Sequence, residues 1–370
     1  MPSTETIREA DRMMTICNAC RYCEGFCAVF RAMLTRRGFV ETDLTYMANL
    51  CHNCRGCYYA CQYAPPHEFN VNIPKVFSEL RVETYQDYAW PGFLAALFRR
   101  NGLVVSLAMG FGLGLVIALT LALQDPAIVF GTHVGEGAFY RVIPYEAMVW
   151  PFGLVFLVMI LAMAVGVVRY WRDTAGGIAQ DLSLPALIGG LWDGLTLENL
   201  RGGGGGCNYP DERFSETRRW LHHFTFYGFM LCFAATSLAT VYHHVFGWIA
   251  PYGYLSGPVI LGTVGGIGLL IGPAGLLWLK WKADPAPETS SLRGMDVAFL
   301  VLLFMTSLTG LLLLAFRETA AMGALLAVHL GFVLAFFLVL PYCKFVHGFY
   351  RLAALVQYAM ERAALAKKAG

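Results

Sequence analysis

The sequence predicts an all-α protein in two parts, a small helical domain over residues 1–90 and a six-helix transmembrane bundle over residues 91–370. Two observations lead to this prediction. The first part is polar and contains eight of the eleven cysteines. The second part contains six apolar stretches, and only 14% of the whole chain is charged. Each stretch is long enough to supply the roughly 20 helical residues that cross a hydrocarbon core of about 30 Å.

The eight N-terminal cysteines repeat the spacing C-x2-C-x2-C-x3-C twice, 34 residues apart. They are Cys17, Cys20, Cys23 and Cys27, then Cys51, Cys54, Cys57 and Cys61. Three thiolates on so short a loop bind one [4Fe-4S] cube, and the fourth usually reaches across to the other cube. Disulfides would need an oxidising compartment, and structural zinc prefers paired C-x2-C knuckles. The spacing therefore predicts a helical two-cluster ferredoxin domain with two [4Fe-4S] clusters.

Residues 1–90 are too few to build a large core, so cluster ligation should supply much of the folding energy of this domain. No charged segment followed by a short apolar run opens the chain, and we therefore expect no cleavable signal. The clusters should remain on the side of the membrane where the chain is made. A turn at Pro91 and Gly92, followed by residues 93–100, suits a lead along the membrane surface into the first span.

The basic residues predict how the spans are oriented. The expected spans cover residues 102–123, 147–168, 220–246, 258–279, 296–316 and 323–350. With both termini inside, all but Arg141 and Arg317 of the 27 Lys and Arg residues lie on the cytoplasmic side, as short inner loops require. We therefore expect a multi-pass protein of the bacterial inner (plasma) membrane, embedded in the lipid bilayer. Topology also accounts for the basic residues, so the net charge of +2 does not indicate nucleic acid as a partner.

The largest connection, residues 169–219, should be cytoplasmic. It contains five consecutive glycines at 202–206, which match no nucleotide-binding fingerprint. We expect a flexible loop that packs beneath the inner histidines or docks to a partner. The three cysteines outside the motifs are expected to be small packing residues: Cys207, Cys232 and Cys343.

Histidines in the spans require an explanation, because a titratable ring in a membrane helix is costly and usually functional. Six of the nine histidines lie near the ends of the third and sixth spans: His222, His223, His243, His244, His329 and His347. These two spans run in opposite directions across the membrane. We therefore expect His222 or His223 to face His347 at one depth, and His243 or His244 to face His329 at the other. Within the doublets, we favour His222 over His223 and His243 over His244.

The histidine spacings agree with this pairing. His329 and His347 are 18 residues apart, or five helical turns, which places both on one face of a continuous helix about 27 Å apart. His222 and His243 are 21 residues apart, or three heptads, which keeps both on one seam of a bundle. Two stacked bis-histidine sites are what two b-type haems require, and the absence of C-x-x-C-H excludes covalent c-type haem. We expect one or two haem b groups, with two favoured; the alternative is that the histidines are hydrogen-bonded packing residues.

Several segments resemble known families. The N-terminal part resembles the helical two-cluster ferredoxin domain of heterodisulfide-reductase C-type subunits, although Ala28 and Gln62 follow the last cysteines where bacterial ferredoxins typically have proline. The sixth span, HLGFVLAFFLVLPYCKFVH, is similar to the cytochrome b subunit of respiratory nitrate reductase. With CQYAPPHEFNVNIPK and LGTVGGIGLLIGPAGLLWLKWK, the whole chain resembles the tricarballylate/citrate utilisation protein B family.

The resemblance implies a membrane electron-transfer protein that serves a separate FAD-containing tricarballylate dehydrogenase. Electrons would pass from the reduced flavin through the two clusters and the haems to quinone. The chain would be an electron-transfer subunit of an oxidoreductase complex and would do no substrate chemistry itself. Two alternatives are a quinol-oxidising subunit that feeds a cytoplasmic reductase and a membrane redox sensor.

Overall fold

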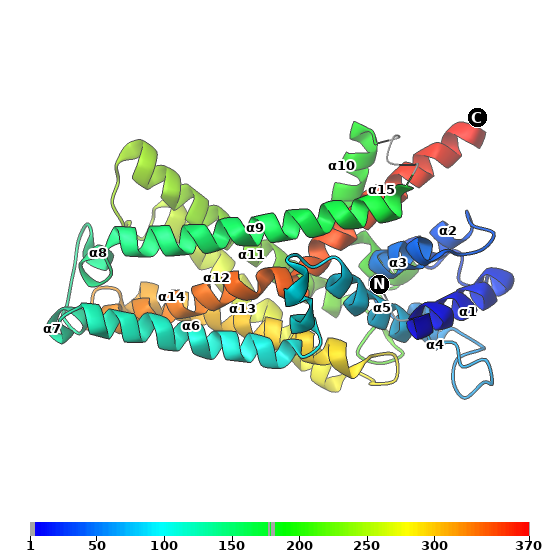
Figure 1. The fold of residues 1–370 in the computed structure, drawn as a ribbon, viewed down its shortest axis with the longest axis horizontal. Helices are drawn as coiled ribbons and strands as arrows, with labels where there is room; N and C mark the ends of the chain where they lie inside the picture. The colour runs from blue at the N-terminus through cyan, green and yellow to red at the C-terminus, as the bar shows by residue number, and fades with distance from the viewer. Residues whose placement is uncertain (1–3, 177, 179–181, 370) are drawn as a thin grey trace.

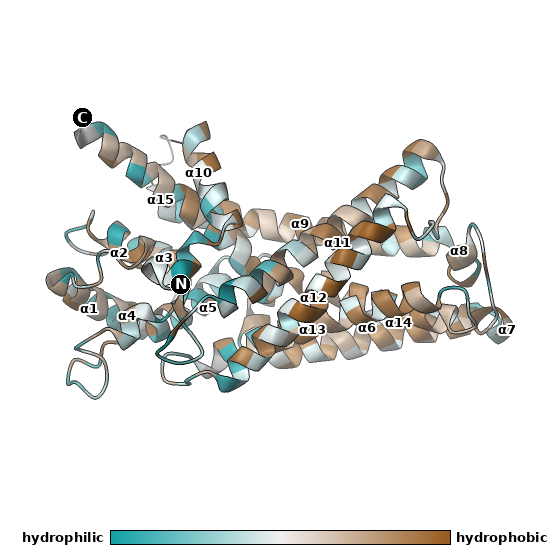
Figure 2. Ribbon diagram, turned by 180° about the vertical axis from the view of Figure 1, so that it is seen from behind, coloured by the Kyte–Doolittle hydropathy of each residue, from teal (hydrophilic) through white to brown (hydrophobic). Residues whose placement is uncertain are grey.

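The computed structural model describes residues 4–176, 178 and 182–369, which are almost entirely helical, and the all-α prediction is confirmed. The molecule is elongated, with both termini near one end (Figure 1). Long apolar helices run from that end to the other, and their surfaces are predominantly hydrophobic (Figure 2). The small N-terminal helices lie beside the C-terminal helix.

The N-terminal domain consists of five helices around two cysteine-containing loops. The helices are α1 (Thr4–Cys20), α2 (Ala28–Met33), α3 (Glu41–Leu50), α4 (Gly56–Tyr59) and α5 (Ile73–Asp87). Asn72 caps α5 by accepting a hydrogen bond from the Lys75 amide, and Pro74 suits the first turn of that helix. The two motifs share one backbone feature, because Arg21 and Arg55, which follow the second cysteine of each motif, both have a positive φ.

Six helices are long and apolar enough to cross a membrane. They are α6 (Asn101–Leu123), α9 (Tyr145–Ala175), α11 (Thr217–Phe246), α12 (Gly257–Lys282), α13 (Ser290–Phe316) and α14 (Met322–Val339). The protein is therefore a multi-pass membrane protein. Glycines allow close packing: a Cβ on Gly265 of α12 would lie only 2.7 Å from the Gly228 carbonyl oxygen of α11.

The sixth span differs from the prediction of one helix over residues 323–350. The helix α14 ends at Val339, and the 3-10 turns η4 (Leu340–Tyr342) and η5 (Lys344–Val346) separate it from α15 (His347–Ala369). Pro341 lacks an amide hydrogen and restricts the residue before it, which accounts for the break. His329 and His347 thus belong to different helices, and the prediction that one continuous helix presents both is wrong.

The segment 169–219 is ordered over much of its length. It contains the end of α9, then α10 (Leu184–Leu195), η3 (Glu198–Gly204) and a hairpin of β1 (Cys207–Asn208) with β2 (Phe214–Ser215). Residues 177 and 179–181 lie outside the described part. The hairpin packs against the cysteine domain, since the Asn208 amide donates to the Cys54 carbonyl oxygen at 2.9 Å. Shorter elements complete the chain: η1 (Gly92–Phe98), α7 (Pro126–Val129) and α8 (Ala138–Val142).

The N-terminal domain is docked on one end of the long helices, which we call the inner end because it is the end expected to lie in the cytoplasm. Leu355 and Tyr358 of α15 belong to the same hydrophobic core as the N-terminal helices. Arg36 forms an ion pair with Glu361 of α15 at 2.7 Å. The connection between α12 and α13 also takes part, because Tyr59 donates to an Asp284 carboxylate oxygen at 2.8 Å. The domain and α15 therefore fold as one unit.

Candidate iron–sulfur and histidine sites

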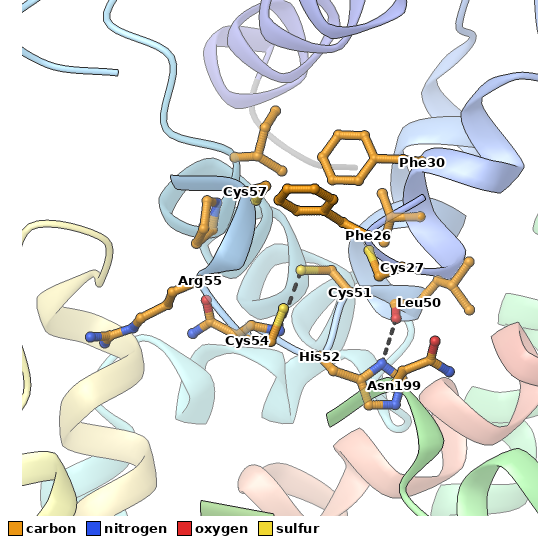
Figure 3. Close-up of a pocket in the computed structure, with 14 residues that line it drawn as sticks. Phe26, Cys27, Phe30, Leu50, Cys51, His52, Cys54, Arg55, Cys57 and Asn199 are labelled. Atoms are coloured by element: carbon orange, nitrogen blue, oxygen red, sulfur yellow. Dashed lines mark hydrogen bonds between the residues drawn. The ribbon is translucent and has the colours of Figure 1, made fainter. Parts of the chain in front are cut away.

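The eight motif cysteines fall into two groups of four. Site B consists of Cys27, Cys51, Cys54 and Cys57, which together line one cavity (Figure 3). Site A consists of Cys17, Cys20, Cys23 and Cys61. Burial, followed by Cys23, Cys61 and Cys20, raises the pKa of the Cys17 thiol to about 12, which shows that these four sulfurs are neighbours.

The grouping crosses the two sequence motifs. Cys27 belongs to the first motif but lines the cavity of the second, and Cys51 is the cysteine that most affects its pKa. Cys61 belongs to the second motif but neighbours the first three cysteines, as the pKa values of Cys17 and Cys23 show. The exchange of the fourth ligand is the arrangement that the spacing predicts. A metal centre bound at either site would therefore link the two motifs to each other.

The protein environment opposes free thiolates at both sites. Burial is the main cause that raises the pKa of Cys23 and Cys27, each to about 12, and it also raises the pKa of Cys54 and Cys57. A bound iron centre would displace the protons of these thiols and supply the compensating positive charge. Eight thiols in two groups of four fit two iron–sulfur cubes.

Other uses of the cysteines fit less well. None of the eleven cysteines, all within the described ranges, is in a disulfide. In the part of the chain that the structure describes, no three His, Cys, Asp or Glu side chains converge on a point that a single metal ion would occupy. A [4Fe-4S] cube does not require such convergence, because each thiolate binds a different iron atom.

The two sites differ in exposure. Cys20 of site A is exposed, and Tyr22 beside it is 67% exposed. Site B is enclosed by the hairpin, and its neighbour His52 is only 6% exposed. The Nδ1 atom of His52 donates to the Leu50 carbonyl oxygen at 2.8 Å, whereas His67 packs with the rings of Tyr63 and Phe69. Site A faces the surface, and site B faces the interior.

His222 and His347 lie together at the inner end of the bundle. Their ring centroids are 6.1 Å apart, with an interplanar angle of 79°. A metal between two imidazoles gives about this separation, because each metal–nitrogen bond is about 2 Å and the half-width of each ring adds to it. The Nδ1 atom of His347 donates to the Lys344 carbonyl oxygen at 2.5 Å, which leaves Nε2 as an electron-pair donor. The Nδ1 atom of His222 is buried and has no hydrogen-bond partner among the described residues. The pair fits a haem iron.

The outer histidines are not brought together in the same way. The ring of His243 stacks on Tyr145, with centroids 4.2 Å apart, and the hydroxyl of Tyr145 lies 2.9 Å from His244 Nε2. His329 lies elsewhere, with its Nδ1 atom 3.2 Å from the Thr309 hydroxyl. The expected partnership of His243 or His244 with His329 therefore does not appear in the contacts of the described residues.

Helix register explains the difference. Phe229 of α11 packs on Phe336 of α14 with ring centroids 6.0 Å apart. The two helices are antiparallel, so His329, seven residues outward from Phe336, lies level with Thr236. His243 is seven residues further out along α11, which is about 10 Å at 1.5 Å per residue.

Two arginines near the inner pair contact the site B loop. Arg218 donates to the Asn53 carbonyl oxygen at 2.7 Å, and Arg351 donates to the Cys51 carbonyl oxygen at 2.8 Å. The sequence alone already places Arg218 at the depth of the inner pair, where it could neutralise haem propionates. Arg351 was missed, and its only signal is that it lies four residues from His347. Lys344, at the same end of the bundle, forms an ion pair with Asp296 at 2.9 Å.

The fold and the cysteine sites define a class, the multi-pass membrane iron–sulfur electron-transfer proteins. Residues 96–368 match the family model described as citrate utilization protein B, and residues 10–87 match that of the citrate utilization protein B Fer4-like domain. The chain is 51% identical over 362 residues to the citrate utilization protein B of Escherichia coli, which covers 97% of this chain and 93% of that protein. The chain belongs to the citrate utilization protein B family. No solved structure matches the chain.

Proposed function

We propose that the protein carries electrons from a separate FAD-containing dehydrogenase of tricarballylate, or of a similar tricarboxylate, to the quinone pool. Two [4Fe-4S] clusters at sites A and B and haem b at the inner histidine pair would act as one-electron carriers. The observation that carries the proposal is the position of site B next to the inner histidines. His52 lines the site B cavity. Arg218 and Arg351, each four residues from one of the inner histidines, donate to the carbonyl oxygens of Asn53 and Cys51 in the site B loop.

Exposure supports an order along this route. A soluble partner can approach Cys20 and Tyr22 at site A, whereas the hairpin and α15 cover site B. Electrons from the flavoprotein would therefore enter at site A and continue through site B to the inner pair. His243 and His329 lie too far apart along the bundle to share one haem, so they are proposed to serve beside the quinone; a second haem would need one of them with a different second ligand.

The membrane arrangement supports an inner-membrane protein with both termini in the cytoplasm. The N-terminal domain and the C-terminus lie at one end of the bundle (Figure 1). All but Arg141 and Arg317 of the 27 Lys and Arg residues lie toward that end in this topology. The name of the Escherichia coli relative refers to citrate, a tricarboxylate, which supports a tricarboxylate dehydrogenase as the partner.

A visible spectrum of the detergent-solubilised protein tests the cofactors. We expect a reduced-minus-oxidised b-type signal, a pyridine haemochrome at one or two haems per chain, and about eight further irons for two cubes. His222→Ala and His347→Ala should each remove the same haem signal. His223→Ala is the matched control, because its ring stacks on Tyr227 instead. A haem-free protein with intact clusters would overturn the haem part of the proposal.

A second measurement tests the route. With the purified flavoprotein and its substrate, the wild-type protein should show haem reduction, and Cys17→Ser or Cys54→Ser should abolish it. Dithionite should still reduce the haem in both variants, because a small reductant does not need the clusters. Unchanged reduction by the flavoprotein in both variants would show that the clusters are not on the route.

A further inference from the structure

Two arginines connect the site B loop to the inner histidine pair. Arg218 precedes His222 by four residues on α11, and Arg351 follows His347 by four residues on α15. Residues four apart lie on the same face of a helix, so each arginine and its histidine project toward the same neighbour. Two separate helices thus present the same combination of side chains to one loop.

Both guanidinium groups bind backbone oxygens of that loop. Arg218 Nη1 donates to the carbonyl oxygen of Asn53 at 2.7 Å. Arg351 Nη2 donates to the carbonyl oxygen of Cys51 at 2.8 Å, and Arg81 donates to the same oxygen at 3.2 Å. Charge-assisted hydrogen bonds of this length are the stronger kind in proteins. The loop is therefore fixed to both histidine-bearing helices at once.

The two positive charges also lie near site B. Arg351 binds the backbone of Cys51 itself, and Arg218 binds the backbone of Asn53, the residue before Cys54. An iron–sulfur cluster gains one negative charge on reduction, and a nearby fixed positive charge favours that state. Net charge and hydrogen bonding around the sulfurs are among the factors that set cluster potentials.

We propose that Arg218 and Arg351 are positioning residues that hold the site B loop against the His222–His347 pair and raise the reduction potential of the cluster bound by that loop. The inference rests on the proposed function, in which site B passes electrons to this pair. Because one arginine comes from each histidine-bearing helix, both helices hold the site B loop at a fixed distance from the His222–His347 pair.

The experiment uses the full-length protein with Arg218→Gln and Arg351→Gln. Arg219→Gln and Arg362→Gln are matched controls on the same helices, because Arg219 binds Glu216 and the Thr196 carbonyl oxygen, and Arg362 binds Asp193. An EPR-monitored redox titration measures the midpoint potential of each cluster. We expect the midpoint potential of the site B cluster to fall by at least about 59 mV, which corresponds to a tenfold change in a one-electron reduction equilibrium. The midpoint potential of the site A cluster and the iron content should not change.

Lysine variants separate charge from position. Arg218→Lys and Arg351→Lys retain the charge but lose the planar guanidinium group. The midpoint potential of the site B cluster should therefore be close to that of the wild-type protein. Electron transfer from this cluster to the haem should be at least tenfold slower than in the wild-type protein, as in the glutamine variants. Wild-type potentials and rates in the glutamine variants would overturn the proposal. Loss of the site B cluster in all four variants would also overturn it, since it would show a purely structural role. If the wild-type protein lacks haem, the proposed route fails instead, and the site B potential still tests the arginines.

Discussion

At the scale of single residues, the cysteine spacing determines the chemistry. Each motif places three thiols within a short segment that includes the end of a helix or a short helix, and Arg21 and Arg55 have the same left-handed conformation in the two segments. Cys27 and Cys61 lie beyond these segments and reach the opposite site. The two sites therefore depend on each other through one cysteine in each direction.

This crossing predicts which cluster a substitution damages. Cys27→Ser should weaken the cluster of site B, because Cys27 lines the cavity with Cys51, Cys54 and Cys57. The EPR signal of the site A cluster should persist, and iron content should fall by about half, as expected for loss of one of two cubes. Cys61→Ser is the matched variant and should have the opposite effect. Loss of the same cluster in both variants would contradict the crossed arrangement.

The candidate sites were only partly predictable from residues alone. The spacing of the eight cysteines was sufficient to predict two groups of four, because ligation depends on short-range spacing within one loop. The pairing of His222 with His347 followed from helix direction, and the two rings do lie together. The position of His243 against Tyr145 was not predictable, because it depends on the register between α11 and its neighbours.

At the scale of elements, the break between α14 and α15 is the main departure from prediction. The apolar run continues through residues 340–346, so hydropathy alone carries the expected sixth span past Val339 to residue 350. Pro341 was the local signal for a break. Most other span boundaries lie within a few residues of prediction, because long apolar helices are defined by composition. The helix α9 is longer than its expected span of 147–168, because it continues to Ala175.

A half-buried ionic network stabilises the break. Asp296 of α13 forms ion pairs with Lys280 of α12 at 2.8 Å and with Lys344 of η5 at 2.9 Å. Asp296→Asn should lower the free energy of unfolding by about 3 kcal/mol, the lower end for buried pairs, because it leaves the charge of Lys344 without its partner. Thermal or denaturant unfolding in detergent measures the loss.

Asp193→Asn provides the comparison for this prediction. Asp193 pairs with Arg362, which is 46% exposed, so its loss should cost less than about 1 kcal/mol. Equal stability of the two variants would show that the network around Asp296 does not hold the α14–α15 connection.

At the scale of the whole molecule, the N-terminal domain is not an independent unit. Its hydrophobic core includes Leu355 and Tyr358 of α15, and Arg36 pairs with Glu361 further along that helix. A domain of this size buries a smaller share of its surface than a larger one, so the added packing against α15 matters to its stability. The sequence indicated a boundary near residue 90 from composition, but composition does not show that the C-terminal helix returns to complete the core.

This shared core predicts how the protein responds to loss of iron. Chelation should unfold the N-terminal domain, because the thiols of sites A and B then lose the group that links the two loops. The segment of α15 around Leu355 should become accessible to protease at the same time, since its packing partners are gone. The six spans should keep their helical far-UV circular dichroism, because their backbone hydrogen bonds are internal to each helix. Limited proteolysis with mass spectrometry, before and after chelation, follows both regions, and the connection between α6 and α9 is the internal control. Continued protection of α15 in the iron-free protein would show that the domain holds its fold without the clusters.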